Sequence, residues 1–221
     1  LHSCTALGLY MPHFVPEWIR DGQFAGLPAE LIPFAIYTRS KYLLTAKREA
    51  EAKAAAETAL SFLPVESGFS LIHLYLRLIC SAALCAAGDM HASEAHLRET
   101  MSLAMPYDYV IPFTEFLTLH SGLIESVSQQ EYPEQYRRVI QLWTRCWKNW
   151  MAVRGRLTMS SATAILSNRE YHLAHLLADD LTYAEAAERL GMSVGSVKNM
   201  ASVIYAKLHV GGKTELKDYV L

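Results

Sequence analysis

The sequence predicts an all-α protein in which helical hairpins precede a small C-terminal domain of four helices. Apolar residues make up 52% of the 221 residues, and alanine and leucine, both strong helix formers, dominate them. Glycine and proline, with 11 and 8 residues, gather between apolar segments, where they mark the ends of helices. No run of alternating β-branched residues is long enough to predict a sheet.

The chain is long enough for one or two domains with a sizeable apolar core. Its net charge of −2 gives no sign that the chain as a whole binds a polyanion. Because the four cysteines lack metal-ligand spacing and nothing indicates an oxidising compartment, we expect buried, reduced thiols in a cytoplasmic protein. These residues are Cys4, Cys80, Cys85 and Cys146. The chain begins with Leu1 rather than Met, so we expect a fragment of a longer protein.

Residues 1–152 are predicted to form a helical-repeat region after an irregular apolar start at 1–27. Helices are expected in three pairs, 28–46 with 48–63, 69–87 with 91–105, and 109–127 with 133–151. Their period of about 38 residues is close to that of tetratricopeptide-type repeats. The segment 82–89, Ala-Ala-Leu-Cys-Ala-Ala-Gly-Asp, resembles the small-residue interior of such a repeat. Each hairpin exposes an apolar face that only a neighbouring hairpin can cover.

The most apolar segment, 69–87, is not predicted to cross a membrane. His73 and Arg77 lie near its middle, and a charge at that depth is costly in lipid. A buried repeat helix, with Arg77 reaching an edge, fits this segment better. The sequence also has no signal-peptide pattern, so we expect no membrane segment in this fragment.

The segment 135–169 contains no acidic residue but combines cations with tryptophans. The tryptophans Trp143, Trp147 and Trp150 share one helical face, which predicts that they pack in the core while the cations stay in solvent. A second interpretation is that the cations add contacts to phosphates. These cations are Arg137, Arg138, Arg145, Lys148, Arg154 and Arg156. Residues 153–165, rich in Ser, Thr and Ala, are predicted to be a linker.

Residues 166–221 are predicted to form four short helices. A hydroxyl side chain that can cap free amides stands at each expected helix start: Ser167, Thr182, Ser193 and Thr214. Glu170 and Glu185 follow the first two by three residues and complete a capping box. Gly191 stands where a left-handed helix end favours glycine, so the second helix is expected to end there.

The second and third of these helices predict a helix-turn-helix unit, in which a short helix, a glycine-containing turn and a longer helix follow one another. In such a unit the longer helix enters the major groove of DNA. The two helices need small residues where they meet, which Ala186 and Ala187 supply. The stripe expected to face the core is Val197, Ala201, Ile204 and Leu208. The opposite stripe is small and polar, as a surface that approaches base edges requires: Gly195, Asn199, Ser202 and Ala206.

Five short segments in the last quarter of the chain are the most specific indication of its function. They are Leu-Ser-Asn-Arg-Glu at 166–170, Ala-Glu-Arg-Leu at 187–190, Ser-Val-Gly-Ser-Val-Lys-Asn at 193–199, Lys-Leu at 207–208 and Lys-Thr-Glu-Leu at 213–216. In order and spacing they resemble the LuxR-type (GerE-like) DNA-binding domain of bacterial transcription regulators, over about the last quarter of the chain. The family usually has glycine where Asp180 stands and histidine where Met200 stands.

The resemblance implies a four-helix domain that binds double-stranded DNA as a homodimer, with the last helix forming the dimer contact. Lys198, Asn199 and Ser202 correspond to its base- and phosphate-contacting positions, and Lys213 to a position that is usually basic. The expected DNA-binding residues are Ser193, Ser196, Lys198, Asn199, Ser202 and Lys213. The alternative is a protein-interaction scaffold whose helix-turn-helix no longer binds DNA tightly, because residues 166–221 carry six cations against seven acidic residues.

No residue pattern in the chain predicts an enzyme, a metal site or a cofactor. His172 and His175 are three residues apart rather than at the spacing of a helical zinc site. The family resemblance implies that both occupy exposed helix positions, so we expect them to be solvated. No catalytic triad or glycine-rich phosphate loop is present. The predicted function is therefore a sequence-specific transcription regulator whose helical repeats bind an unknown effector or protein partner.

Overall fold

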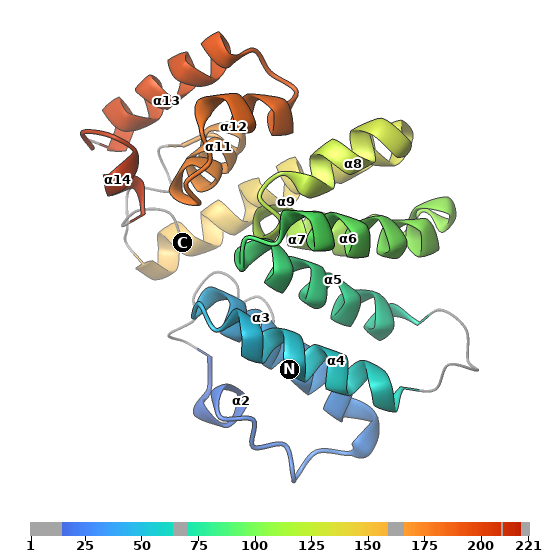
Figure 1. The fold of residues 1–221 in the computed structure, drawn as a ribbon. Helices are drawn as coiled ribbons and strands as arrows, with labels where there is room; N and C mark the ends of the chain where they lie inside the picture. Colours follow the sequence, from blue (N-terminus) through green and yellow to red (C-terminus); the bar gives the residue numbers. More distant parts are fainter. Residues whose placement is uncertain (1–14, 64–69, 159–165, 209, 218–221) are drawn as a thin grey trace. The chain divides into compact units, whose positions relative to one another are not determined.

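The computed structural model describes residues 15–63, 70–158, 166–208 and 210–217. Within these ranges every regular element is a helix and no strand occurs, which confirms the all-α fold class (Figure 1). The chain divides into two compact units, Leu1–Pro112 and Phe113–Leu221. The division falls within helix α7 (Ile111–Phe116).

The first unit contains the two helical hairpins that the sequence predicts, so helix type and pairing are confirmed there (Figure 1). Helix α3 (Ile32–Thr45) pairs with α4 (Glu49–Phe62), and α5 (Leu71–Ala86) pairs with α6 (Met90–Ala104). The short elements α2 (Glu17–Arg20) and η2 (Ala29–Leu31) precede them, and η3 (Met105–Tyr107) follows. The likeness to true tetratricopeptide repeats stays a prediction.

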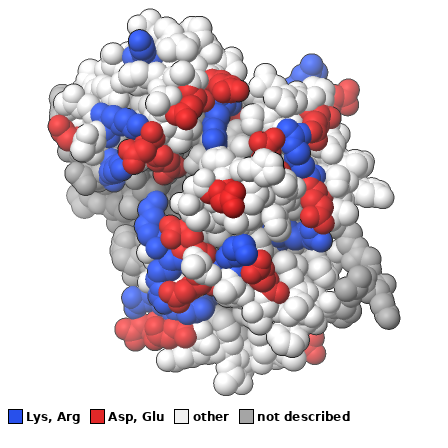
Figure 2. Space-filling view, in the orientation of Figure 1, with Lys and Arg blue, Asp and Glu red and all other residues white. Residues whose placement is uncertain are grey.

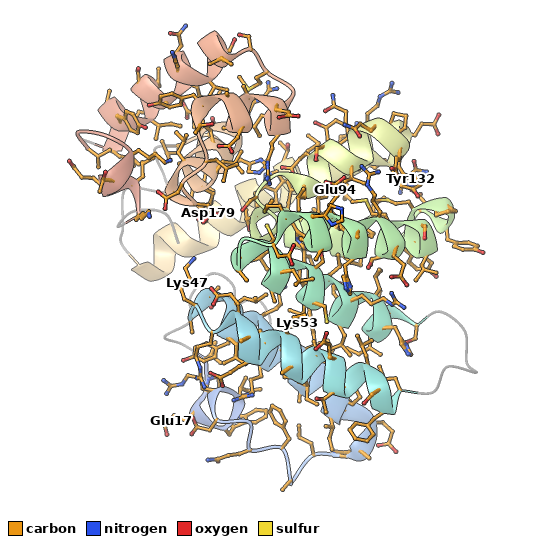
Figure 3. All side chains as sticks on the ribbon, in the orientation of Figure 1. Glu17, Lys47, Lys53, Glu94, Tyr132 and Asp179 are labelled. Carbon is orange, nitrogen blue, oxygen red and sulfur yellow. The ribbon has the colours of Figure 1, made fainter. Side chains whose placement is uncertain are left out.

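Helix α5 is the buried repeat helix expected from its composition. It packs against α3, α4 and α6, and Leu74, Leu76 and Leu78 are fully buried. Arg77 reaches the edge of the unit, where its Nη1 donates a hydrogen bond of 2.7 Å to Glu99. Lys53 on α4 and Glu94 on α6 likewise lie on the outer surface of the hairpins (Figure 3). Among the described residues, no helix combines the length and the hydrophobicity that crossing a membrane requires.

The second unit contains more than the four predicted C-terminal helices. It continues from α7 through η4 (Leu117–Leu119), α8 (Leu123–Glu131) and α9 (Pro133–Thr158). The C-terminal helices follow as α11 (Asn168–Ala178), α12 (Tyr183–Leu190), α13 (Val194–Leu208) and α14 (Lys213–Leu216). Residues 113–152, expected in the repeat region, therefore cluster with the C-terminal domain. Helix α9 also extends into the segment 153–165 predicted as a linker, and residues 159–165 lie outside the described ranges.

The prediction of a single helix over 109–127 is wrong. The chain turns between η4 and α8, where Ser121 and Gly122 have φ angles of 45° and 84°. Left-handed backbone cannot continue a right-handed helix, so α8 starts in a new direction. The turn also brings the backbone at Gly122 so close to Arg189 that an added Cβ would lie 2.6 Å from the Arg189 Cβ atom.

Helix α9 buries part of its predicted tryptophan stripe. Trp143 is 4% exposed, while Arg137 and Arg145 are exposed, as expected for an amphipathic helix. The side chains of Trp147, Lys148, Trp150, Arg154 and Arg156 lie outside the described residues. Cys80 and Cys85 are buried as expected, but Cys146 is exposed because it lies on the solvent face of α9.

We predict that Gly122→Ala destabilises the protein more than Gly88→Ala does. Both glycines have positive φ, 84° and 85°, so alanine costs each about 1–2 kcal/mol in backbone strain. An added Cβ at Gly88 meets nothing within 4 Å, whereas at Gly122 it meets Arg189. Overpacking adds about 1–3 kcal/mol at Gly122. Urea unfolding of both variants measures the difference, and equal losses would contradict the contact with Arg189.

Candidate nucleic-acid interface

The ends of the C-terminal helices carry the hydrogen bonds that the sequence predicts. The Ser167 hydroxyl accepts from the Glu170 backbone N–H at 3.3 Å, and the Glu170 carboxylate accepts from the Ser167 N–H at 2.7 Å. Thr182 and Glu185 form the same capping box, with distances of 3.2 and 2.7 Å. These bonds fix where α11 and α12 begin, because free amides at a helix start need acceptors.

The turn between α12 and α13 has the geometry of a helix-turn-helix. Gly191 ends α12 with a φ angle of 60°, and the Met192 N–H donates to the Ala187 carbonyl at 2.9 Å. Ala186 and Ala187 are 0% and 3% exposed, as expected for small residues where helices meet. Helix α13 lies against α12 and α11 (Figure 1).

The two faces of α13 separate as predicted. Val197, Ala201, Ile204 and Leu208 are buried. The outward residues Gly195, Asn199, Ser202 and Ala206 are exposed. Val203, which the sequence analysis did not select, is also exposed, at 45%. Its position four residues after Asn199 is the signal that would have identified it.

Five of the six predicted DNA-binding residues lie along α13 and its first turn. Ser193 caps the helix by accepting from the Ser196 N–H at 3.1 Å, and the two serine hydroxyls are 2.8 Å apart. Lys198, Asn199 and Ser202 are exposed on the following turns. The Ser202 hydroxyl donates to the Lys198 carbonyl at 3.1 Å, so its oxygen is left as an acceptor. The sixth residue, Lys213, belongs to α14.

The ammonium group of Lys213 makes contacts within the domain. Its Nζ donates to the Leu181 carbonyl at 3.0 Å and lies 3.9 Å from Asp180. It therefore ties α14 to the connection between α11 and α12. Asp180, where the family usually has glycine, has a φ of 67°, which explains why glycine suits that position.

The prediction that Thr214 caps the last helix is wrong. Helix α14 begins one residue earlier, at Lys213, and its N-cap residue Gly212 has no side chain to accept a hydrogen bond. Glu215 takes part of this role instead, because its carboxylate accepts from the Gly211 N–H at 3.0 Å.

Most cations of residues 166–217 are engaged in contacts within the unit. Lys207 donates to both carboxylate oxygens of Glu170 at 2.8 Å, and Lys217 donates to Asp180 at 2.7 Å. Although partial burial opposes ionisation of Glu170, its hydrogen bonds from Lys207 and Ser167 keep the pKa of this carboxyl below its usual value. On the face drawn in Figure 2, cations and acidic residues alternate, without a broad described surface of one sign.

The expectation that His172 is solvated is wrong. His172 is 5% exposed, and its Nε2 lies 2.7 Å from Oε1 of Glu125, which is 2% exposed. The approach lacks hydrogen-bond alignment, and no described residue supplies another hydrogen bond to these atoms. Burial lowers the pKa of His172 to about 4 and raises that of Glu125 to about 8, against smaller opposing effects on Glu125 of its own backbone and of Arg189.

Helix α8 covers part of the C-terminal helices, and the Glu125–His172 pair lies in this contact. Arg189 of α12 donates to the Ser121 carbonyl, and the Ser121 hydroxyl donates to Asp179 at 3.1 Å. Asp179 lies at the carboxyl end of α11 (Figure 3). His175, also expected in solvent, is half-buried and stacks edge-on against Tyr171. No single-residue signal in the sequence marks this packing, because the partners are far apart along the chain.

This arrangement of a short capped helix, a left-handed glycine turn and a longer helix with an exposed polar face defines a helix-turn-helix domain. Residues 164–220 match the family of bacterial regulatory proteins of the luxR family. This part of the chain is therefore a luxR-family helix-turn-helix domain. Neither a curated protein nor a solved structure matches the chain.

We predict that the stability of the second unit falls as pH rises from about 6.5 to about 8. Between pH 4 and 8 the native Glu125–His172 pair holds one proton, whichever partner carries it. The unfolded pair, with usual pKa values of 4.5 and 6.5, also holds one proton between those values but none above 6.5. The contribution of the pair to the free energy of unfolding is thus constant from pH 4.5 to 6.5. Above pH 6.5 it falls by up to about 1.4 kcal/mol per pH unit.

Urea unfolding at several pH values, compared with the double variant Glu125→Gln, His172→Gln, measures this effect. Other titrating groups contribute equally to both proteins, so their difference isolates the pair. Parallel pH profiles for the two proteins would contradict the retention of one proton by the native Glu125–His172 pair between pH 6.5 and 8.

Proposed function

We propose that this chain is a sequence-specific DNA-binding transcription regulator that reads the major groove with α13. The observation that carries the proposal is the exposed, small and polar outward face of α13, within a luxR-family helix-turn-helix domain. Apart from Lys198 at its edge, this face carries only short side chains, so base edges can approach the helix closely. The domain acts as a homodimer in this proposal, and each copy contacts one half-site.

The predicted residues have different roles in the proposal. Asn199 contacts a base edge, since its amide offers a donor and an acceptor side by side. Lys198 contacts a phosphate or a guanine, and Ser202 accepts a hydrogen bond from a base amino group. One of the two hydroxyls of Ser193 and Ser196 donates to a phosphate at the start of α13, because the other already donates within the pair. Lys213 supports the surface through the Leu181 carbonyl rather than contacting DNA in this conformation.

The helical hairpins of the first unit are proposed to bind an effector or a protein partner in the cytoplasm. The proposal rests on their architecture, because stacked hairpins offer extended surfaces for partners. A rival function is a protein-interaction scaffold in which the helix-turn-helix contacts protein. The engagement of Lys207, Lys213 and Lys217 within the unit favours it, since cations held by carboxylates and carbonyls neutralise few phosphates.

We predict that Lys198→Ala weakens specific DNA binding without changing stability. Duplex selection from random DNA with the full chain, followed by titration of the enriched site against salt, tests this. Loss of one phosphate contact lowers the salt slope by about 1 per protomer, and loss of a base contact costs about 1–3 kcal/mol. Lys217→Ala is the control, because its ammonium is 2.7 Å from Asp180 in the fold.

Absence of any enriched duplex, together with tight self-association or capture of a protein by the helix-turn-helix, would favour the scaffold. Equal loss of affinity in the two lysine variants would mean that α13 has no special part in binding.

A further inference from the structure

We propose that α13 recognises a sequence rich in A·T pairs, with Asn199 contacting an adenine and Val203 contacting the C5-methyl group of a nearby thymine. This inference rests on the proposed function and names the bases that the same surface reads. Asn199 and Val203 are one helical turn apart, so their side chains are neighbours on the outward face.

Val203 is informative because of the residues around it. A single exposed aliphatic residue on a protein surface needs no explanation. Here, however, a 45% exposed valine stands among Gly195, Asn199, Ser202 and Ala206, whose side chains are short. Because these neighbouring side chains are short, the two methyl groups of Val203 can contact the bases on the floor of the major groove. The thymine methyl is the apolar group that the major groove offers.

Asn199 adds an independent preference for A·T pairs. An asparagine amide forms two hydrogen bonds with adenine, to N7 and from the N6 amino group. Arginine is the side chain that most often pairs with guanine, and α13 contains none. Lys198 can reach a guanine, but it lies at the edge of the outward face, nearer the buried stripe than Asn199 does. The centre of the face therefore favours adenine and thymine.

The spacing of Asn199 and Val203 along α13 limits the distance between the adenine and the thymine that they contact. Side chains four residues apart on a helix are separated by roughly 5–6 Å along its axis. Successive base pairs are about 3.4 Å apart along the DNA axis. The adenine and the thymine thus lie in the same half-site, on adjacent base pairs or with one pair between them.

The test removes single atoms or groups from the DNA. After duplex selection with the full chain, each thymine of the enriched half-site is replaced by deoxyuridine, which lacks only the C5-methyl group. Each adenine is replaced in turn by 7-deazaadenine, which lacks the N7 acceptor. Affinities are measured for the wild type, Val203→Ala, Asn199→Ala and the control Val194→Ala. Val194 is 41% exposed but lies three residues before Val197, beside the buried stripe.

We expect one deoxyuridine position to weaken wild-type binding about fourfold, which is the effect of losing one buried methyl group. The same substitution leaves Val203→Ala unaffected but weakens Val194→Ala as much as wild type. One 7-deazaadenine position weakens wild type but not Asn199→Ala. Enrichment of a half-site whose contacted pairs are G·C, or equal deoxyuridine losses in Val203→Ala and wild type, overturns the inference and leaves DNA binding intact. Failure to enrich any duplex overturns the proposed function as well.

Discussion

Helix α12 is eight residues long, yet it packs against α8, α11 and α13, and this crowding limits the size of its side chains. Ala186 and Ala187 are both buried, so that neighbouring helices approach the α12 backbone closely. On another side, Arg189 leaves no room for a Cβ atom at Gly122. Packed interiors accept little extra volume, so a larger residue at any of these positions would displace the neighbouring helices. The packing of α12 against its neighbouring helices therefore depends on small residues in α12 and in the turn before α8.

Charged side chains around this packing hold helix ends together. Lys207 joins α13 to the capping box of α11 through Glu170, and Lys213 joins α14 to the Leu181 carbonyl. Exposed ion pairs contribute only about 0–1 kcal/mol each, so these contacts add little stability individually. Their larger consequence is electrostatic, because each engaged cation is one fewer available to attract phosphates. Lys198 remains exposed on α13, the helix proposed to enter the groove.

Local features of the C-terminal domain were predictable from the sequence, whereas contacts between distant segments were not. The capping boxes at Ser167 and Thr182 and the left-handed Gly191 each depend on a few consecutive residues, whose types and spacing define the geometry. The outward face of α13 follows from helical periodicity alone. The burial of His172 depends on Glu125 of α8, and the turn at Ser121 depends on Arg189, 68 positions later. No local pattern encodes such pairs, so the sequence predicted a longer helix at 109–127 and a solvated histidine.

Because most cations of the described residues 166–217 are engaged within the unit, the domain depends more on base contacts than on phosphate contacts to select DNA. Binding of any protein to arbitrary DNA comes almost entirely from phosphate neutralisation, whereas discrimination comes from contacts to base edges. Helix α13 has two lysines, of which Lys207 is held by Glu170 and Lys198 is exposed beside Asn199, Ser202 and Val203. Such a helix has weak general attraction for DNA, but it keeps the groups that distinguish bases. Weak attraction to arbitrary sequence reduces competition from the many non-specific sites of a genome. In the proposed homodimer, two such helices multiply the base-edge contacts without adding much non-specific affinity, so selectivity rises faster than total binding strength.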